Sequence, residues 1–320
     1  MANAAGEIAV TIAPENAPKS CLRERKFCIV SLHLSKLFRR SATLLAFTLT
    51  AVSLVPSLAQ NSPKTVNNSV SKEPLRAFDE KIPHSTAQLE MLPVPGGKFS
   101  LLNPKTKKVE EVTIKPFYLA KTETIWDVYD AYYLQQDLTE DQKANKVDAA
   151  SRPSYTYIPP DHGWGHVGYP AIHMSHQSVD FFVKWLSKQT GKKYRLPTEA
   201  EWEWAARAGK KEWKVFSKED LEKAAWYKGN SDEKVQPVGK KQPNAWGFYD
   251  ILGNTGEWCI DLEGKPVVCG GAFTDTAENI SPLRRAYWER KWQETDPQIP
   301  KSKWWLADAP FAGLRVVCEP

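Results

Sequence analysis

The stretch that decides the fold of this chain is Tyr194-Arg195-Leu196-Pro197-Thr198-Glu199-Ala200-Glu201-Trp202-Glu203-Trp204-Ala205-Ala206-Arg207-Ala208-Gly209. Its start is typical of a strand that turns into a helix, because Pro197 keeps the residue before it out of the helical region. Thr198 and Glu201 have the spacing of a capping box, in which two side chains satisfy free backbone N–H groups. The stretch therefore predicts a short helix that begins near Thr198 and ends by Gly209, a residue suited to a left-handed cap.

Further elements are expected on both sides of this helix. Thr124 is placed to cap a helix, and residues 178–190 carry apolar side chains on one helical face. Residues 91–118 have the pattern of strands around a turn. After Gly209 the chain is rich in Trp, Gly and Pro and offers only short strand candidates. The sequence predicts an irregular, loop-rich α+β domain with two or three helices and short antiparallel strands.

The first 59 residues have the pattern of a targeting segment. Three basic residues between positions 36 and 40 precede an apolar run over 42–55, and Ser57-Leu58-Ala59 resembles a signal-peptidase site. The run is short for a bilayer span. We expect a signal peptide with a long basic start and export to the periplasm or the extracellular space; a membrane anchor is the alternative.

Residues 60–89 are rich in polar residues and proline, which predicts a disordered linker before a folded domain at 90–320. The first 59 residues hold seven of the 43 Lys and Arg but only three of the 38 Asp and Glu. The rest of the chain is therefore nearly neutral. We expect no nucleic-acid partner, which would need a clustered basic face, and membrane contact only through an uncleaved targeting segment.

Motifs spread over residues 91–318 resemble those of the formylglycine-generating enzyme family, the sulfatase-modifying-factor domain. Besides the opening stretch, they follow the family's order: Gly97-Lys98-Phe99, Lys115-Pro116-Phe117-Tyr118, Pro243-Asn244-Ala245-Trp246-Gly247-Phe248-Tyr249-Asp250, Gly253-Asn254-Thr255-Gly256-Glu257-Trp258, Gly270-Gly271-Ala272-Phe273 and Gly313-Leu314-Arg315. The resemblance implies a C-type-lectin-like fold. By the family's name it also implies sulfatase maturation, the conversion of a cysteine to formylglycine.

The family's oxidase chemistry needs two cysteines after a Gly-Gly-Ser motif, because soft thiolates bind copper(I) and one of them engages the substrate thiol. Here the motif reads Gly270-Gly271-Ala272, and Asp275 and Ile280 occupy the cysteine positions. No cysteine lies between Cys269 and Cys318. An aspartate does not replace a thiolate toward copper(I). The resemblance therefore implies a member without the copper-dependent reaction, and copper is not an expected cofactor.

Two segments match calcium sites of the resembling family. Asn254 and Glu257 lie in a turn whose glycines let backbone carbonyls point inward, a pattern suited to a hard cation. Asn230 and Ser231 lie where the family has a second site, although the acidic partner downstream is missing. Both are hypotheses for calcium. The alternative for the first is a tight turn in which backbone N–H groups hold Glu257.

Four histidines lie close together in the sequence: His162, His166, His173 and His176. Some relatives of the resembling domain are non-haem iron enzymes, in which two histidines and a carboxylate bind the metal. His162 and His166 are the candidate iron ligands, with Asp161 or Asp180 as the carboxylate. A structural role for these histidines is the alternative.

The region before the last strand is crowded with tryptophan, arginine and lysine, which binding surfaces use as anchors. The family's peptide-binding groove is bordered by this region, so Arg284, Trp288 and Trp305 are the groove candidates. The alternative is that the tryptophans stack to hold the domain together. Among the cysteines after the targeting segment, Cys269 and Cys318 would form a disulfide if their strands are neighbours; buried free thiols are the alternative.

Together these features favour an exported protein that binds a peptide, protein or glycan partner through a formylglycine-generating-enzyme-like domain without copper oxidase activity. Two alternatives stay open. One is a non-haem metal-dependent oxidoreductase of the same superfamily, and the other is a true sulfatase-maturing enzyme.

Overall fold

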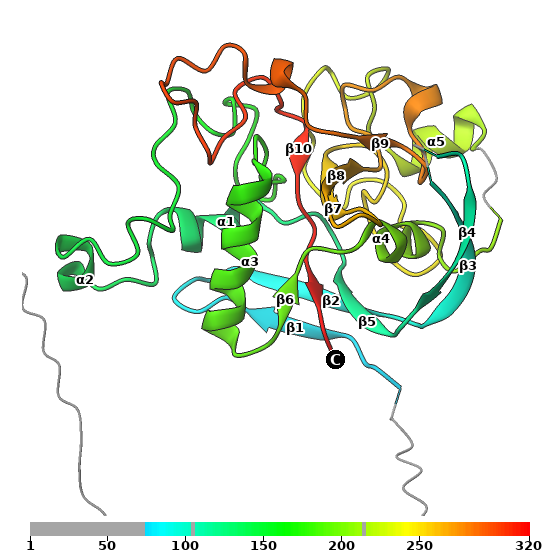
Figure 1. Ribbon diagram of the computed structural model, residues 1–320, viewed down its shortest axis with the longest axis horizontal. Helices are drawn as coiled ribbons and strands as arrows, with labels where there is room; N and C mark the ends of the chain where they lie inside the picture. Colours follow the sequence, from blue (N-terminus) through cyan, green and yellow to red (C-terminus); the bar gives the residue numbers. More distant parts are fainter. Residues whose placement is uncertain (1–73, 104–105, 213–215) are drawn as a thin grey trace, which may run out of the picture. The chain divides into compact units, whose positions relative to one another are not determined.

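The computed structural model describes residues 74–103, 106–212 and 216–320, which belong to one folded unit (Figure 1). The predicted signal peptide at 1–59 and the first part of the predicted linker lie outside the described residues. Within the described part, no helix combines the length and the apolar character needed to cross a membrane.

Folded structure begins earlier than the composition predicts. β1 (Phe78–Lys81) and the start of β2 (Gln88–Val94) lie within the predicted linker, so the linker boundary at residue 89 is wrong. The two strands pair antiparallel. β1 is an edge strand, and its Glu80 is buried and accepts a hydrogen bond from the Tyr194 hydroxyl at 2.7 Å. This distant polar partner orders a segment that has few apolar residues of its own.

Two sheets and one hairpin form the β-structure. The five-stranded sheet has the order β1-β2-β5-β11-β6 and is completed by β5 (Phe117–Ala120), β6 (Tyr194–Arg195) and β11 (Val317–Cys318). The second sheet, β10-β7-β8-β9, consists of β7 (Gly256–Ile260), β8 (Pro266–Cys269), β9 (Arg285–Ala286) and β10 (Ala312–Gly313). β3 (Gly97–Leu102) and β4 (Val109–Ile114) form the hairpin. The β10–β7 pair is parallel, and the other ladders are antiparallel.

The described residues contain five α-helices: α1 (Trp126–Tyr133), α2 (Glu140–Ala144), α3 (His176–Thr190), α4 (Glu199–Ala206) and α5 (Lys218–Ala224). Two short 3-10 helices, η1 (Ala277–Asn279) and η2 (Arg290–Gln293), lie in the later loops. The sequence predicts the three helices that have an apolar face. It does not predict α2 and α5, because α2 buries no residue and α5 buries only Leu221. The loop-rich α+β class is confirmed.

The capping residues predict the helix starts with unequal accuracy. Thr198 caps α4, and its side chain and that of Glu201 form the predicted capping box. Thr124 does not cap α1, since Ile125 takes the N-cap position and the Thr124 side chain is buried. α3 begins two residues before the predicted start, because Ser175 is its cap.

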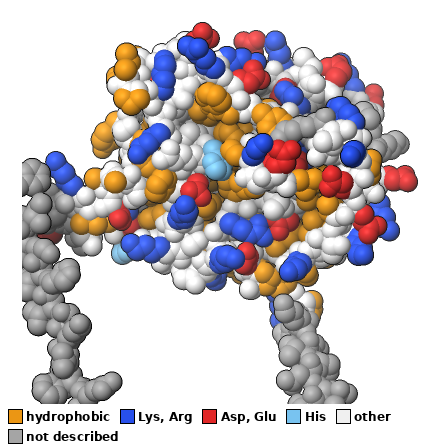
Figure 2. All heavy atoms as spheres, in the orientation of Figure 1, with side chains coloured by type: hydrophobic (Ala, Val, Ile, Leu, Met, Phe, Trp, Pro, Cys, Tyr) orange, Lys and Arg blue, Asp and Glu red, His pale blue; other side chains and the backbone are white. Residues whose placement is uncertain are grey.

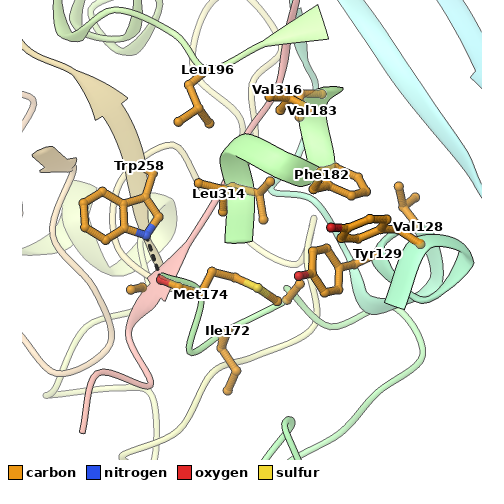
Figure 3. Close-up of a cluster of buried hydrophobic side chains, with 14 of the residues drawn as sticks. Val128, Tyr129, Ile172, Met174, Phe182, Val183, Leu196, Trp258, Leu314 and Val316 are labelled. Carbon is orange, nitrogen blue, oxygen red and sulfur yellow. Dashed lines mark hydrogen bonds between the residues drawn. The ribbon is translucent and has the colours of Figure 1, made fainter. Parts of the chain in front are cut away.

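The main core lies where α1 and α3 pack against the end of the chain (Figure 3). Tyr129 of α1 lies against Phe182 of α3 with ring centroids 5.2 Å apart. Leu314 lies beside them in the segment between β10 and β11, and Trp258 of β7 donates a hydrogen bond to the Met174 carbonyl at 2.8 Å. The second sheet and the five-stranded sheet are therefore tied together through one shared apolar centre.

The predicted disulfide between Cys269 and Cys318 is wrong. Cys269 ends β8 in the second sheet, whereas Cys318 lies in β11 of the five-stranded sheet. Both residues, and Cys259, are free and buried. All three act as small apolar side chains in the core.

Candidate functional site

The segment between β8 and β9 holds Asp275 and Ile280, the two positions at which the resembling family has its cysteines. In the turn after β8, Gly270 and Gly271 both have positive φ angles, of 96° and 81°. A side chain at Gly271 would meet Ile280 Cδ1 at 2.8 Å, so only glycine lets the turn approach this residue. Asp275 closes the turn, because its Oδ2 accepts a hydrogen bond from the Ala272 N–H at 3.0 Å.

Asp275 and Ile280 have different environments. The other carboxylate oxygen of Asp275, Oδ1, accepts a hydrogen bond from Arg284 Nη2 at 3.2 Å. Ile280 is buried in the second apolar cluster together with Phe248 and Leu252. The two positions therefore no longer act as a pair: one carries a partly exposed ion pair, and the other is part of the core.

Asp275 and Arg284 lie at a cavity of about 320 Å³, here called the Asp275 cavity. Its charged and polar wall comes from the turn after β8 and from the segments around η2: Thr274, Asp275, Arg284, Glu289, Lys291 and Asp308. Its apolar wall includes Val268, Trp292 and Phe311. A cavity of this size with a few charged groups over an aromatic floor is typical of ligand sites.

The aromatic floor is held in place by its own contacts. Trp292 of η2 packs edge-on against Phe311 with ring centroids 5.1 Å apart, and against Trp258 of β7 at 6.0 Å. The Asp308 N–H donates to the Trp292 carbonyl at 3.0 Å, and Asp308 also accepts from Thr295. Floor and wall are thus held by defined contacts, while Glu289 and Lys291 at the rim are exposed.

Among the described residues, no thiol lines the Asp275 cavity. Val268 faces it, and Cys269 follows on the same strand, so its side chain points to the opposite face of the sheet. Burial raises the pKa of Cys259, which works against formation of a thiolate there. The residues of this cavity do not fit copper(I), which requires soft ligands.

The three predicted groove residues do not form one surface. Arg284 lines the Asp275 cavity, whereas Trp305 is buried and lines a second cavity. Trp288 is exposed and lines neither. No sequence pattern indicates this separation, because the segment between these residues has no periodicity.

The side chains of the first predicted calcium site already have partners. Glu257 forms an ion pair with Arg315 at 2.7 Å and accepts a hydrogen bond from Trp202 Nε1 at 2.6 Å. Asn254 Oδ1 accepts from the Gln236 N–H at 2.8 Å, and its Nδ2 donates to Glu123. A cation beside Arg315 would have to displace these partners, so the arrangement does not fit calcium.

The second predicted calcium site is also engaged. Asn230 Oδ1 accepts a hydrogen bond from the Tyr227 N–H at 2.8 Å, and its Nδ2 donates to Glu222. The Ser231 hydroxyl donates to the Phe273 carbonyl. These contacts hold the turn after α5 against the Gly271 turn. Calcium binding stays a prediction at both sites, and the geometry favours structural roles.

His162 and His166 point to different partners. His166 lies between two carboxylates, with Nε2 2.7 Å from Asp130 and Nδ1 2.9 Å from Asp161. Burial alone would lower the pKa of His166, but the hydrogen bonds to both aspartates outweigh it and raise the pKa. His162 instead stacks on His173, with ring centroids 4.5 Å apart. The two predicted iron ligands do not converge.

The two predicted carboxylate ligands are placed differently. Asp161 contacts His166, whereas Asp180 binds Lys184 on the surface of α3 at 2.7 Å. Across residues 74–103, 106–212 and 216–320, no group of three or more His, Cys, Asp and Glu side chains is arranged to hold a metal ion. Iron stays a prediction without a ligand set in the described part.

A buried charge cluster beneath the Asn254 turn escapes sequence reasoning. Glu123, Asp250 and Glu257 surround Arg315, and all four are nearly fully buried. Burial, together with the neighbouring carboxylates, raises the pKa of Glu123 well above its usual range, and burial raises the pKa of Asp250 to about 6. The sequence does contain a signal for this cluster, because Asp250, Glu257 and Arg315 each belong to one of the quoted motifs.

Charged side chains are mixed on the surface seen in Figure 2. Lys and Arg are intermixed there with Asp and Glu, and hydrophobic side chains are visible between them. This mixed distribution agrees with the near-neutral charge of the chain after residue 59.

Known proteins share both the sequence pattern and the fold of this chain. A family profile described as Sulfatase-modifying factor enzyme 1-like domain matches residues 79–317. Inactive C-alpha-formylglycine-generating enzyme 2 of Bos taurus is 25% identical, with 61% of this chain and 80% of that protein covered. Treponema denticola variable protein 1 superposes with a TM-score of 0.56 at 20% identity and covers 76% of this chain and 99% of its own. PvdO from Pseudomonas aeruginosa gives a TM-score of 0.55 at 23% identity, with 78% of this chain and 100% of its own covered. Both solved structures share the fold.

Proposed function

Because this chain belongs to the sulfatase-modifying-factor family, we propose that it is a member that binds a peptide or protein partner at the Asp275 cavity without copper-dependent oxidation. The observation that carries this proposal is the Asp275–Arg284 ion pair, which stands where the oxidase chemistry requires a thiolate. The similarity to a protein named as an inactive formylglycine-generating enzyme supports the same proposal.

The cavity offers the groups that hold a peptide. Arg284 is partly exposed and its partner Asp275 is more buried, with side-chain exposures of 38% and 18%. A partly solvated arginine can exchange its partner for a ligand carboxylate at low cost, because such ion pairs contribute little to stability. Trp292 and Phe311 provide an apolar floor for a neighbouring side chain. We therefore infer an acidic residue beside an apolar one as the recognised element.

Binding takes place outside the cytoplasm in this proposal. The targeting pattern at 1–59 supports export, which would bring the Asp275 cavity into contact with extracytoplasmic partners. A glycan is the alternative ligand, since aromatic floors also bind sugar rings.

Binding to displayed peptides tests the proposal. The purified domain is screened against a random peptide library and, in parallel, against a glycan array, and the best peptide is titrated by calorimetry. We expect peptides with an acidic residue next to an apolar one, and Arg284→Gln should weaken their binding about tenfold, the value of one charge-assisted hydrogen bond. Lys184→Gln, an exposed change on α3, is the matched control and should bind as the parent does.

Two results would contradict peptide binding at the Asp275 cavity. Selection of glycans alone would replace the peptide by a sugar ligand. Equal affinity of the Arg284→Gln and parent proteins for the selected peptide would place binding elsewhere on the domain.

A further inference from the structure

A second cavity, of about 140 Å³, lies between the loop at 156–160 and the segment at 295–307. We call it the His173 cavity. It is lined mainly by apolar side chains and contains Tyr157, Ile158, His173, Trp305 and Leu306 among its walls. Among the residues that the structure describes, its lining shares none with that of the Asp275 cavity. It is therefore a separate site, and its ligand is independent of the proposed function.

The cavity lining includes His173 beside other polar residues, among them Asp296, Gln298 and Ser302. The Nδ1 atom of His173 lies 2.7 Å from the Leu306 carbonyl oxygen, which can only accept a hydrogen bond. Nδ1 must therefore carry the proton, and Nε2 presents a lone pair. In the described residues, Nε2 is buried and has no hydrogen-bond partner. A buried acceptor without a donor is costly, and a ligand that donates would relieve that cost.

The neutral state of His173 is secured by its surroundings. Burial, with a smaller contribution from the stacked His162 ring, lowers the pKa of His173 to about 4, against the opposing effects of the Leu306 carbonyl and Asp308. The residue also has a φ of 63°, a left-handed conformation that is uncommon outside glycine. At neutral pH this lining residue is thus uncharged, and its Nε2 is an acceptor that has no partner among the described residues.

The walls suit a flat ring. Trp305 is buried, and its indole N–H donates to the Ser154 carbonyl at 2.7 Å, which holds the ring in place. It also packs edge-on against Tyr133 with centroids 5.2 Å apart. A volume of 140 Å³ is close to that of apolar protein cavities of about 150 Å³ that hold one benzene molecule. One six-membered ring therefore fills the space.

The mouth of the cavity is apolar and exposed. Tyr157 and Ile158 line the cavity and are 70% and 47% exposed. Tyr155, two residues earlier, is also exposed. Ile299, next to the lining residue Gln298, is almost fully exposed. Exposed apolar side chains grouped around a pocket mark a surface for a protein partner.

We propose that the His173 cavity holds the phenol ring of a tyrosine presented by a partner protein. The ring packs against Trp305, and its hydroxyl donates a hydrogen bond to His173 Nε2. The exposed side chains of Tyr157 and Ile158 cover the partner segment around that tyrosine. Phenylalanine would fill the same space but would leave Nε2 without a donor.

Matched small probes test this assignment by NMR on the purified domain. p-Cresol and N-acetyl-tyrosinamide are titrated beside toluene and N-acetyl-phenylalaninamide, which differ from them only by the hydroxyl. We expect both phenols to bind about tenfold more tightly than their partners without the hydroxyl, the value of one hydrogen bond to a buried acceptor. Binding should also shift the His173 Nε2 resonance, a change that ring burial elsewhere would not cause.

Two substitutions test whether the phenols bind in this cavity. Ala307→Leu adds volume to the lining and should abolish binding of both phenols. Val109→Ala changes an exposed residue of β4, outside the lining and the mouth of the cavity, and should leave binding intact. Since the Ala307 change affects packing, the His173 resonance of the parent protein serves as the test that does not depend on folding of a variant.

Three results would overturn the proposal. Equal affinity for p-cresol and toluene would remove the role of the hydroxyl. Binding of p-cresol without N-acetyl-tyrosinamide would replace the partner's tyrosine with a small free phenol. Absence of binding by either phenol would leave the cavity without the proposed ligand.

Discussion

Two buried charge clusters hold this domain together, and they differ in charge balance. Around α4, Arg285 binds Glu199 at 2.7 Å and Glu203 at 2.5 Å, and Arg207 also binds Glu203. Under the Asn254 turn, the single Arg315 faces three carboxylates, of which it binds only Glu257 directly. The first cluster pairs each carboxylate with a guanidinium, whereas the second leaves an excess of buried negative charge.

The hydrogen bonds of the second cluster show how the excess is accommodated. Glu123 accepts from the Thr255 N–H at 2.7 Å and from the side chains of Thr255 and Asn254, all neutral donors. Asp250 accepts from the Gly239 N–H at 2.6 Å, and its other oxygen has no partner in the described residues. Equal burial thus gives a charge-paired cluster around α4, and a cluster under the Asn254 turn in which the pKa of Asp250 is raised to about 6.

Removing the cation of the unbalanced cluster should have the largest effect. Arg315→Met leaves three buried carboxylates without a counter-charge, so we expect a loss of about 3–5 kcal/mol in the free energy of unfolding at pH 7.5. Urea denaturation measures it. Arg284→Met, which breaks a partly exposed pair, is the control and should cost less than about 1 kcal/mol. Similar losses in the two variants would contradict the importance of burial.

Neutralising Asp250 should reveal its contribution to the pH dependence of stability. The pKa of Asp250 is raised to about 6 in the folded protein from an ordinary value of 3.8. Its protonation stabilises the fold fully below pH 3.8, and this contribution is lost as the pH rises through about 6. Asp250→Asn should therefore gain about 1–3 kcal/mol relative to the parent at pH 8 and nothing at pH 4.

The measurement is urea unfolding of both proteins at the two pH values. Asp180→Asn, on the exposed face of α3, should follow the parent within about 0.5 kcal/mol at each. A parallel pH dependence of the Asp250→Asn and parent proteins would show that Asp250 is ionised in the fold throughout.

The contacts of His166 with Asp130 and Asp161 should contribute less to stability, and this contribution should also be lost as the pH rises. The raised pKa of His166 means that its stabilising contribution is complete below its ordinary value of 6.5 and is lost as the pH rises through the higher folded value. Asp161→Asn should cost about 1 kcal/mol at pH 6 and less at pH 9. Hydrogen exchange at Gly168, whose N–H donates to Asp127, reports opening of this loop. Unchanged exchange at pH 6 would contradict the role of these contacts.

Calcium should have the smallest effect. Because the oxygens of Glu257 and Asn254 already have partners, we expect 1 mM calcium to raise the melting temperature by less than about 1 °C over an EDTA-treated sample. A rise of about 5 °C would restore the calcium site and show that the ion replaces part of the Asn254 network.

Local signals make part of the fold predictable. The sequence places α4 correctly because its cap, Thr198 with Glu201, is contained in four residues. It does not predict β1, because Glu80 finds its partners, Tyr194 and Lys192, more than one hundred residues away. The candidate site is likewise predictable only where the signal is local. Motif spacing places Asp275 at the turn after β8, whereas the separation of Arg284 from Trp305 depends on a loop without any repeat.

Mass spectrometry of a Cys-x-Pro-x-Arg sulfatase peptide decides whether the domain has lost the copper-dependent reaction. The purified domain is incubated with this peptide, copper(I), oxygen and a reductant, and a formylglycine-generating enzyme is run beside it. With Asp275 and Ile280 in the cysteine positions and no thiol among the described residues that line the cavity, we expect an unconverted peptide while the comparison enzyme converts its own sample. Formylglycine in the sample with this protein would contradict the loss of oxidase activity and make the chain a sulfatase-maturing enzyme.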